Sequence, residues 1–540
     1  MKRNKIVTII GCIALVLSGC NSWTGNQSVD AVQNISDNVE AMMSVSQESA
    51  TKLSSYSTED VDVNLTGDYS DEAIEAAWDA EEATSIKLDS DVITVDGSGA
   101  EVEDYIVTIT KKGTYVVTGS IENGQIIVDV SEDENVQLVL NGAQITCTDS
   151  SPIQVNSAKN LYLTLADGTE NMVTDGRTAQ STDSEEEDDS DAPTAAIFSE
   201  NDLIINGGGK LTVTGNYNDG ISSKDDLQII DGEILVTSTD DGIVGKDSVS
   251  VRSGTIEIHS GDDGLKSSNS DDTSKGNVII DGGDINIYAS GDGMKSEMVL
   301  VINDGTVIIH ESEEGLESLN VVLNGGVVTV TSKDDGINVS DGSSSNSEKT
   351  SFDGKQMVSQ NSAGGGPNGK APIDPNREGK VSGNEAPGKA GGGMMNQAIE
   401  GAIVVNGGTV TVNAGGDGLD SNGHIQITGG NIIVSGSTNG GNSALDYNGT
   451  FDITGGTLLA YGNSEMSEKP SDISTQAFVS TKFETDIAAS TTVEITDEEG
   501  NILHTLETMK SMNDIVISSP RILAGSTYQV NAGGTLAEAK

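Results

Sequence analysis

The chain is poor in cysteine, in aromatic residues and in basic residues. Its three cysteines are Cys12, Cys20 and Cys147, and only Cys147 lies beyond the first 20 residues. A disulfide framework or a thiolate zinc site is therefore excluded from the folded part of the chain. Aromatic residues make up 3% of the chain, so little of its surface can stack on neutral sugars.

Basic residues are few beside the acidic ones. Lysine and arginine number 28 against 85 aspartates and glutamates, which gives a formal net charge of −57. This excludes nucleic acid as a partner, because phosphate contacts need clustered cations. It also argues against direct contact with anionic lipid headgroups. The acidic surface serves either solubility alone or the binding of divalent cations.

The first 20 residues are typical of a lipoprotein signal peptide. Basic residues precede an apolar stretch from 6 to 17, and Leu17-Ser18-Gly19-Cys20 resembles a bacterial lipobox. Cleavage would leave Cys20 to carry a lipid, which anchors the protein to the outer face of the bacterial cell membrane without a spanning helix. The alternative is a plain secretory signal with an incidental cysteine.

A three-residue motif recurs between residues 200 and 460. It consists of an acidic residue, a glycine and an aliphatic residue. Its spacings are 22, 22, 29, 22, 21 and 82 residues, which indicate a repeat near 22 with insertions of about 7 and 60 residues. Such a period predicts a solenoid, because one repeat cannot bury its apolar face without a stacked neighbour. The acidic residues of the motif are Asp219, Asp241, Asp263, Asp292, Glu314, Asp335 and Asp417.

A second series of glycines divides each repeat into strands. Aliphatic residues alternate with polar ones before and after each glycine, which is a strand pattern. Each repeat then holds two strands about a glycine corner and a third short strand after the acidic corner. Three-strand coils of this kind predict an all-β parallel β-helix. The glycines of this series are Gly232, Gly254, Gly283, Gly305, Gly326, Gly408, Gly430 and Gly456.

Composition divides the chain into five parts, of which the signal peptide, residues 1–20, is the first. Residues 21–85 are polar and predict a disordered stalk, and residues 86–199 predict an N-terminal β cap with the first irregular coils. The regular helix spans 200–474, with a flexible Gly/Ser/Pro-rich insertion at 341–399. Residues 475–540 predict a C-terminal β cap that closes the open end. An acidic run, Asp183–Asp191, lies in a loop of the N-terminal part.

The acidic corners suggest calcium. Residues one coil apart lie about 4.8 Å from each other, so the corner carboxylates would form a ladder. At an effective dielectric near 20, two such charges repel by about 3 kcal/mol. Ca²⁺ relieves this repulsion, since it accepts about six to eight oxygen ligands. Second carboxylates stand beside several corners, at Asp240, Asp262, Glu313 and Asp334.

Two alternatives accompany this prediction. Aspartate before glycine is also simply good turn chemistry, which needs no metal. Zinc and copper are disfavoured, because the four histidines (His259, His310, His424 and His504) are scattered along the sequence.

Several segments resemble a known family. Asn216 to Ile221, Asp240 to Val249 and Ala444 to Phe451 resemble calcium-binding, carbohydrate-binding β-helix proteins of clostridial cell surfaces, and the likeness extends over about residues 90–535. The resemblance implies a right-handed coil similar to that of pectate lyases, calcium on repeated aspartates including Asp446, and binding of polygalacturonate-like plant-wall polysaccharide and of cellulose. It implies no established catalysis. Glu314 departs from the pattern, as do Gly291 and Gly416, which replace the first acid of a pair.

Binding of an acidic glycan fits the charge of the chain, because calcium can bridge the carboxylates of both partners. We expect a monomer with polysaccharide as its partner. Trp23 and Trp78 both fall outside the repeats. The candidate glycan-contacting residues are Tyr217, Lys224, Lys246, Lys266, Lys295 and Tyr447, with Tyr288 and Tyr461 as further stacking rings.

Two other functions remain open. A calcium-dependent polysaccharide lyase would need a base for the proton alpha to the uronate carboxyl, and the four lysines just named follow the acidic corners. Lysines that simply pair with neighbouring aspartates are the favoured interpretation. The third possibility is a structural adhesin, in which the solenoid acts as a calcium-stiffened rod.

Overall fold

The computed structural model describes residues 65–90, 92–178, 193–341 and 398–540. The signal peptide, Cys20, the acidic run Asp183–Asp191 and almost all of the expected insertion lie outside the described residues. Every described residue belongs to one compact unit, Val61–Lys540. In the described part, no helix has the length and apolar character that crossing a membrane requires.

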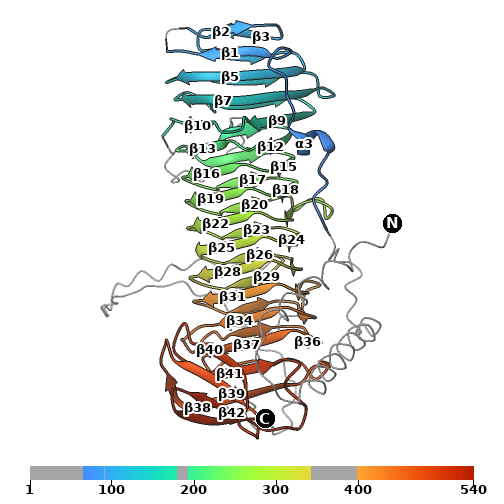
Figure 1. The fold of residues 1–540 in the computed structure, drawn as a ribbon, viewed down its shortest axis with the longest axis vertical. Helices are drawn as coiled ribbons and strands as arrows, with labels where there is room; N and C mark the ends of the chain where they lie inside the picture. Colours follow the sequence, from blue (N-terminus) through green and yellow to red (C-terminus); the bar gives the residue numbers. More distant parts are fainter. Residues whose placement is uncertain (1–64, 91, 179–192, 342–397) are drawn as a thin grey trace, which may run out of the picture. The chain divides into compact units, whose positions relative to one another are not determined.

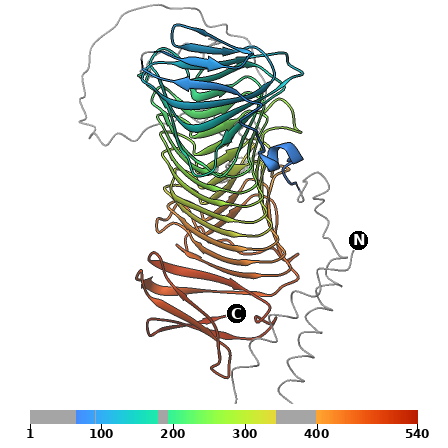
Figure 2. The ribbon, with the colours of Figure 1, turned by 45° about the horizontal axis from the view of Figure 1, so that its top comes forward.

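The coils of this unit carry three parallel ladders of strands, and the fold is all-β and β-helix-like (Figures 1 and 2). The predicted three-strand coil is therefore confirmed, whereas the handedness of the coil remains a prediction. The first ladder carries the acidic corners at the starts of its strands, and the other two ladders flank the glycine corners.

The first ladder contains β4 (Ile106–Ile109), β6 (Gln125–Asp129), β8 (Ile153–Ser157), β11 (Ala195–Ser199), β14 (Asp219–Ser223), β17 (Ile243–Gly245), β20 (Leu265–Ser267), β23 (Met294–Ser296), β26 (Leu316–Ser318), β29 (Ile337–Val339), β32 (Leu419–Ser421) and β35 (Leu445–Tyr447). The second contains β9 (Asn160–Leu165), β12 (Asp202–Asn206), β15 (Asp226–Ile229), β18 (Ser248–Val251), β21 (Asn277–Ile280), β24 (Val299–Ile302), β27 (Asn320–Leu323), β30 (Ala402–Val405), β33 (His424–Ile427) and β36 (Phe451–Ile453). The third contains β10 (Glu170–Asp175), β13 (Lys210–Gly215), β16 (Glu233–Ser238), β19 (Thr255–Ser260), β22 (Asp284–Ala289), β25 (Thr306–Glu311), β28 (Val327–Ser332), β31 (Thr409–Ala414), β34 (Asn431–Ser435) and β37 (Thr457–Gly462). Two long strands, β5 (Gly113–Ile121) and β7 (Asn135–Cys147), begin the second and third ladders together.

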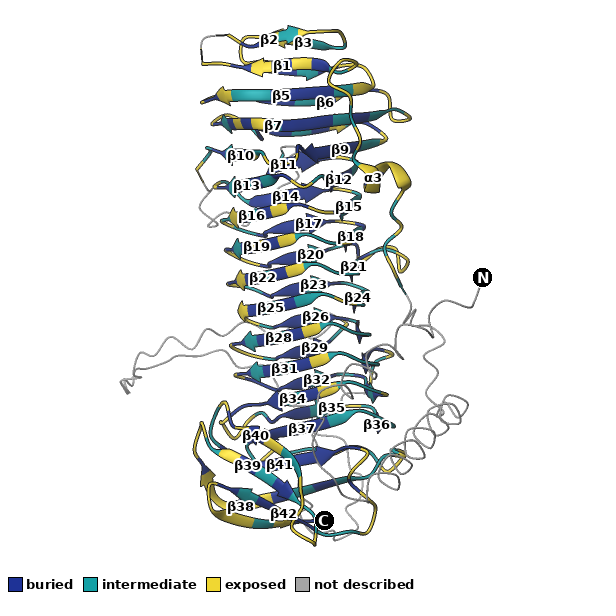
Figure 3. Cartoon of the chain, viewed as in Figure 1, coloured by how far each residue is buried: buried dark blue, intermediate teal, exposed yellow. Residues whose placement is uncertain are grey.

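The core is a set of aliphatic stacks inside the coils. Residues in register from coil to coil are alike in size and are almost wholly buried, because each inward side chain packs on its equivalent above and below (Figure 3). The inward stack of the first ladder is Ile221, Ile243, Leu265, Met294, Leu316, Ile337, Leu419 and Leu445.

The glycine corners between the second and third ladders have a left-handed backbone. All eight glycines of that series have φ between +72° and +127°, a region that favours glycine. The glycines of the acidic corners are needed for a different reason. A Cβ on Gly336 would lie 2.2 Å from Val412 Cγ1 and 2.6 Å from the Gly418 carbonyl oxygen, so only glycine fits between adjacent coils.

Both insertions into the repeat lie at the same corner of the coil, between the first and second ladders. The short one lies between β20 and β21, and the long one lies between β29 and β30. The ladder continues across each, since β18 pairs with β21 and β27 pairs with β30 in unbroken register.

The expectation of a disordered stalk up to residue 85 is wrong for residues 65–83. This N-terminal segment contains helix α3 (Asp71–Glu75) and lies against the coils (Figure 1). Its polar groups bind the outer side chains of the second ladder, which composition alone does not reveal. The bonds are Asn303 Nδ2 to the Leu65 carbonyl (2.9 Å), Tyr69 Oη to Asp281 Oδ2 (2.9 Å), Asn206 Nδ2 to the Ala73 carbonyl (2.9 Å) and Gln137 Nε2 to the Ala77 carbonyl (3.2 Å).

Antiparallel strands cover both ends of the coil stack. At the first end, β1 (Thr84–Leu88) pairs with β2 (Thr94–Asp96), and β3 (Ala100–Glu103) pairs with β4. At the other end, β41 pairs with β37, and a separate four-stranded sheet follows. The remaining strands are β38 (Phe478–Ile487), β39 (Thr492–Thr496), β40 (Ile502–Glu507), β41 (Met512–Ser518), β42 (Tyr528–Ala532) and β43 (Thr535–Ala539).

Replacement of Gly336 by alanine tests the close approach of adjacent coils. We expect Gly336→Ala to destabilise the protein by about 2 kcal/mol, the cost typical of overpacking a rigid site. Thermal melting followed by circular dichroism measures this loss. Gly441→Ala is the matched control, because a Cβ at Gly441 meets nothing within 4 Å. Equal melting temperatures for the two variants would contradict the packing argument.

Candidate acidic binding site

The corner carboxylates lie in one column along the first ladder. Five of them, Asp241, Asp263, Asp292, Asp335 and Asp417, link two coils, because one carboxylate oxygen accepts the backbone N–H of the acidic or equivalent residue in the next coil. One oxygen of each of these five carboxylates is therefore used in turn chemistry, as the metal-free alternative expects. The bonds include Asp263 N to Asp241 Oδ1 (3.0 Å), Asp292 N to Asp263 Oδ1 (2.8 Å), Glu314 N to Asp292 Oδ1 (3.2 Å) and Asp417 N to Asp335 Oδ1 (2.6 Å).

A second column runs beside the first, on the outward position three residues after each corner. The strand register aligns its members from coil to coil, and their charge changes along the stack. Two uncharged residues come first, followed by two lysines, a glutamate, an asparagine and two aspartates. In order, the members are Ser222, Val244, Lys266, Lys295, Glu317, Asn338, Asp420 and Asp446.

Lysines neutralise one part of the paired columns. Lys266 Nζ lies 2.9 Å from Asp241 Oδ2 and 2.9 Å from Asp263 Oδ2, so it joins two coils. Lys295 does the same between Asp292 and Glu317. Burial opposes the lysine charge, but the carboxylates raise the pKa of both lysines above the ordinary value. These lysines are thus counterions of the column, the interpretation favoured from the sequence.

The last coils lack such a cation. We call Asp335, Asp417, Asp420, Asp446 and Glu468 the lysine-free cluster, since no lysine or arginine nitrogen lies within 4 Å of these carboxylates in the described part of the chain. Burial and neighbouring carboxylates together raise the pKa of Asp335 to about 8 and that of Asp420 to about 7. The pKa values of Asp417 and Glu468 rise to about 6 for the same reasons.

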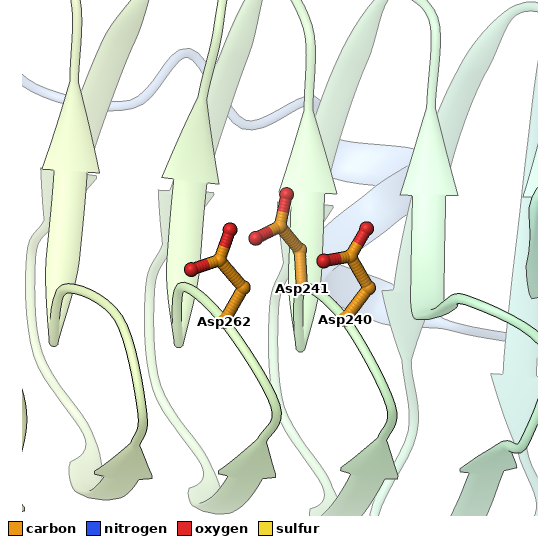
Figure 4. A group of neighbouring side chains, drawn as sticks. All are labelled: Asp240, Asp241 and Asp262. Carbon is orange, nitrogen blue, oxygen red and sulfur yellow. The ribbon is translucent and has the colours of Figure 1, made fainter. Parts of the chain in front are cut away.

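Two groups of carboxylates come close enough to share an ion. Oxygens of Asp240, Asp241 and Asp262 all lie within 4.8 Å of one another, and the three side chains approach one another from adjacent coils (Figure 4). Asp292, Glu314 and Glu317 form the second group. Burial, and then the Glu317 charge, raise the pKa of Glu314 to about 8.

Glycine leaves space beside two acidic pairs. A Cβ on Gly416 would lie 2.3 Å from Asp334 Oδ1 and 2.4 Å from Asp335 Oδ1. A Cβ on Gly291 would likewise lie 2.3 Å from Asp262 Oδ1 and 2.7 Å from Asp263 Oδ1. The glycines that break the paired-acid pattern therefore keep these carboxylate oxygens accessible.

An amide oxygen lacks a partner beside the lysine-free cluster. Asn338 stands next to Asp420 in the ladder and is 8% exposed. Its Nδ2 donates to Glu314 Oε2 at 2.7 Å, whereas its Oδ1 has no hydrogen-bond partner in the described residues. A buried, unpaired amide oxygen next to carboxylates is suited to a cation.

The tyrosines chosen from the sequence are mostly engaged within the protein. The Arg177 guanidinium covers the Tyr217 ring at 4.1 Å from its centroid, and Tyr447 packs edge-on against Phe451 and donates to the Lys469 carbonyl at 2.7 Å. Tyr461 is 1% exposed, which rules it out as a stacking ring.

Two of the histidines are brought together, so the description of all four as scattered is wrong in space. Tyr288 stacks between His259 and His310 with centroid distances of 4.6 and 4.4 Å. They meet because β19, β22 and β25 are consecutive in the third ladder. The histidines cover both faces of the Tyr288 ring, which leaves only its edge to a ligand.

Lys224 and Lys246, the other two lysines predicted to contact a glycan, lie apart from the ion pairs of Lys266 and Lys295. Lys224 Nζ is 5.7 Å from the centroid of the Phe198 ring, and Lys246 follows β17 at a turn. Neither forms an ion pair with a described residue.

Sequence reasoning missed Glu317, Asp420 and Glu468. Glu317 and Asp420 stand three residues after a corner acid, as Lys266 and Lys295 do, so an alignment of the repeats at that offset would have found them. No repeat signal marks Glu468, which follows the last coil and reaches the cluster through the tertiary fold. Asp446 belongs to the second column, beside Asp420.

Together, the ladders and carboxylate columns define a β-helix-like solenoid with an acidic edge. Residues 103–354 match the family model described as carbohydrate-binding domain-containing protein. A protein of the same description from Acetivibrio thermocellus is 39% identical over 152 residues, which are 28% of this chain and 52% of that protein. The chain thus spans about half the length of this curated relative. The solved polysaccharide lyase-like protein from C. thermocellum, a gadolinium derivative, is 34% identical, with a TM-score of 0.40 over 48% of this chain and 98% of that one.

The raised pKa values predict how stability depends on pH without metal. Carboxyl groups with folded pKa values of about 6 to 8 hold protons that the unfolded chain releases near pH 4. Their stabilising effect is complete below pH 4 and is lost as pH rises to about 8. In EGTA, we expect the melting temperature to fall from pH 5 to pH 8, and to fall less in Asp335→Asn, which cannot titrate. Glu484→Gln, on the exposed surface, should follow the wild type; equal slopes for all three would contradict the assignment.

Removal of a bridging lysine tests the counterion role. Lys266→Met leaves Asp241 and Asp263 without their shared cation, and we expect a loss of about 2 kcal/mol at pH 7, between the values for exposed and buried pairs. Urea unfolding measures it. Lys210→Met removes an exposed pair with Glu233 on β16 and should leave the unfolding midpoint nearly unchanged. Indistinguishable midpoints for the two variants would show that Lys266 is not a counterion of the column.

Proposed function

We propose that this protein is an exported carbohydrate-binding lipoprotein that holds Ca²⁺ on its acidic edge and binds acidic plant-wall polysaccharide there. The single observation that carries the proposal is the lysine-free cluster, a column of half-buried carboxylates without counterions. The match of residues 103–354 to the carbohydrate-binding domain-containing family model supports a glycan as the partner.

The donor set of the cluster fits calcium. Asp335, Asp417 and Asp420 of the cluster supply hard carboxylate oxygens, the neighbouring Asp334 offers another, and the unpaired Oδ1 of Asn338 adds a neutral one. The space that Gly416 leaves beside two of these carboxylates gives room for an ion. Ca²⁺, when bound, supplies the positive charge that the lysines supply in the preceding coils. Without an ion, Asp335 and Asp420 remain partly protonated near neutral pH, as their raised pKa values require.

The Asp240, Asp241 and Asp262 group is a second candidate position. Its carboxylates lie closer together, but Lys266 already binds the Oδ2 atom of Asp241. We therefore place the stronger site in the lysine-free cluster, where no cation competes.

An acidic glycan needs a positive bridge to approach this edge. The carboxylates of the protein repel uronate groups, and an ion with open coordination positions can accept oxygens from both partners. The role of the protein side chains is to hold the ion at the surface of the ladder. Lys266 and Lys295 do not offer a lyase base, because a base at neutral pH needs a lowered pKa and both pKa values are raised.

Affinity electrophoresis in gels containing polygalacturonate tests this function. With 1 mM-scale calcium we expect retardation of the wild type, and EGTA should abolish it. Asp335→Asn keeps the acceptor for the Asp417 N–H but removes a charge, so we expect about tenfold weaker retention. Glu484→Gln, with the same change in charge, should bind like the wild type. Retention that is equal in calcium and in EGTA would refute the calcium bridge.

A further inference from the structure

The N-terminal segment 65–83 lines one side of an open cavity that lies apart from the acidic edge. The cavity has a volume of about 810 Å³ and lies against the corners that follow β9, β12, β15 and β18. Its polar lining consists mainly of Trp78, Asn141, Arg252 and three carboxylates, those of Glu75, Asp167 and Asp231. A shallow groove continues from it along the glycine corners as far as Gly305, with Gly208 and Asp231 common to both.

Trp78 supplies an aromatic wall to this cavity. One side of the indole packs against Val116, Val139 and Ala166, which fixes its position on the coils. The side chain is only partly buried, and it also lines the cavity. A fixed indole at the mouth of a polar groove can stack on the C–H face of a pyranose ring, because the apolar sugar face matches the aromatic surface.

Arg252 supplies unused hydrogen-bond donors. Of the three arginines in the described residues, Arg177 binds Asp175 and the Pro193 carbonyl, and Arg521 binds the carbonyls of Leu503 and Ile502. The Arg252 guanidinium forms no hydrogen bond or ion pair with any described residue, although it lines the cavity. Its five N–H groups are therefore available to a ligand.

The carboxylates of the cavity determine which ligand charge it favours. Asp167 Oδ1 accepts from Gly208 N at 3.0 Å and Asp231 Oδ1 accepts from Gly232 N at 2.8 Å, which holds both side chains in place. Each keeps a second oxygen that can accept a sugar hydroxyl. Three carboxylates beside one guanidinium leave the cavity negative, so it disfavours uronates and favours uncharged sugars with many hydroxyl donors.

We infer that the cavity at Trp78 and Arg252 is a second glycan-binding site, which takes neutral sugar residues without calcium. It rests on the proposed carbohydrate-binding function and extends it to a different sugar class at a different place. The groove along the glycine corners gives a linear neutral chain a path, since successive coils rise about 4.8 Å, close to the length of one pyranose residue.

Tryptophan fluorescence in EGTA tests this site. The chain has 2 tryptophans, so Trp23→Phe leaves Trp78 as the sole indole. In that background we expect cellohexaose to change the emission in a saturable manner, and hexagalacturonate to have no effect. By isothermal titration, Trp78→Phe and Arg252→Gln should each weaken cellohexaose binding about tenfold. Tyr288→Ala, which changes an exposed aromatic residue outside the cavity, should leave the affinity unchanged.

The outcomes separate this inference from the calcium-dependent function. If cellohexaose and a matched galactan hexasaccharide both fail to bind in EGTA, the neutral-sugar site is wrong, whatever polygalacturonate does in calcium. If a neutral sugar binds but both variants retain full affinity, the location is wrong. Circular dichroism checks the fold of each variant, and Arg252→Gln decides alone if Trp78→Phe is unstable. Loss of polygalacturonate binding with neutral binding intact would overturn only the calcium bridge.

Discussion

Parallel in-register pairing between successive coils is the constraint on which the rest of this structure depends. Each backbone group of one coil bonds to the coil beside it, so every residue stands next to its equivalent about one strand spacing away. For aliphatic residues this repetition is favourable, and the buried stacks result. For carboxylates it is unfavourable, because like charges are held side by side. The same geometry thus produces both the stable core and the strained acidic edge.

The groups that offset the repulsion between carboxylates differ from one part of the stack to another. Lys266 and Lys295 occupy the second column in the middle coils, where each forms ion pairs with carboxylates of two adjacent coils. Beyond Glu317 the second column changes to asparagine and aspartate, so no lysine offsets the burial and carboxylate charge that raise the pKa of Asp420. The position of a residue in a two-column array, more than its local sequence, decides whether an aspartate is an ion-pair partner or a candidate ligand.

The period of the repeat made much of the fold predictable. The glycine corners, the alternating strands and the column of acidic corners all follow from one spacing, because a solenoid repeats its contacts as it repeats its sequence. Helix α3 and the segment around it were not predictable, since a polar composition hides bonds such as Tyr69 to Asp281 that only the folded coils offer. Trp78 seemed irrelevant to sugars for the same reason: it lies outside the repeats in sequence but beside them in space. The change of charge along the second column could have been predicted from the sequence by comparing the residues three positions after each acidic corner.

Both lengthenings of the repeat leave and rejoin the solenoid between the first and second ladders, while the pairing of β18 with β21 and of β27 with β30 continues across them. At that corner, therefore, added chain length leaves the pairing of the flanking strands unchanged. Evolution, or an engineer, can graft a new peptide there and present it on a stiff scaffold without retuning the interior.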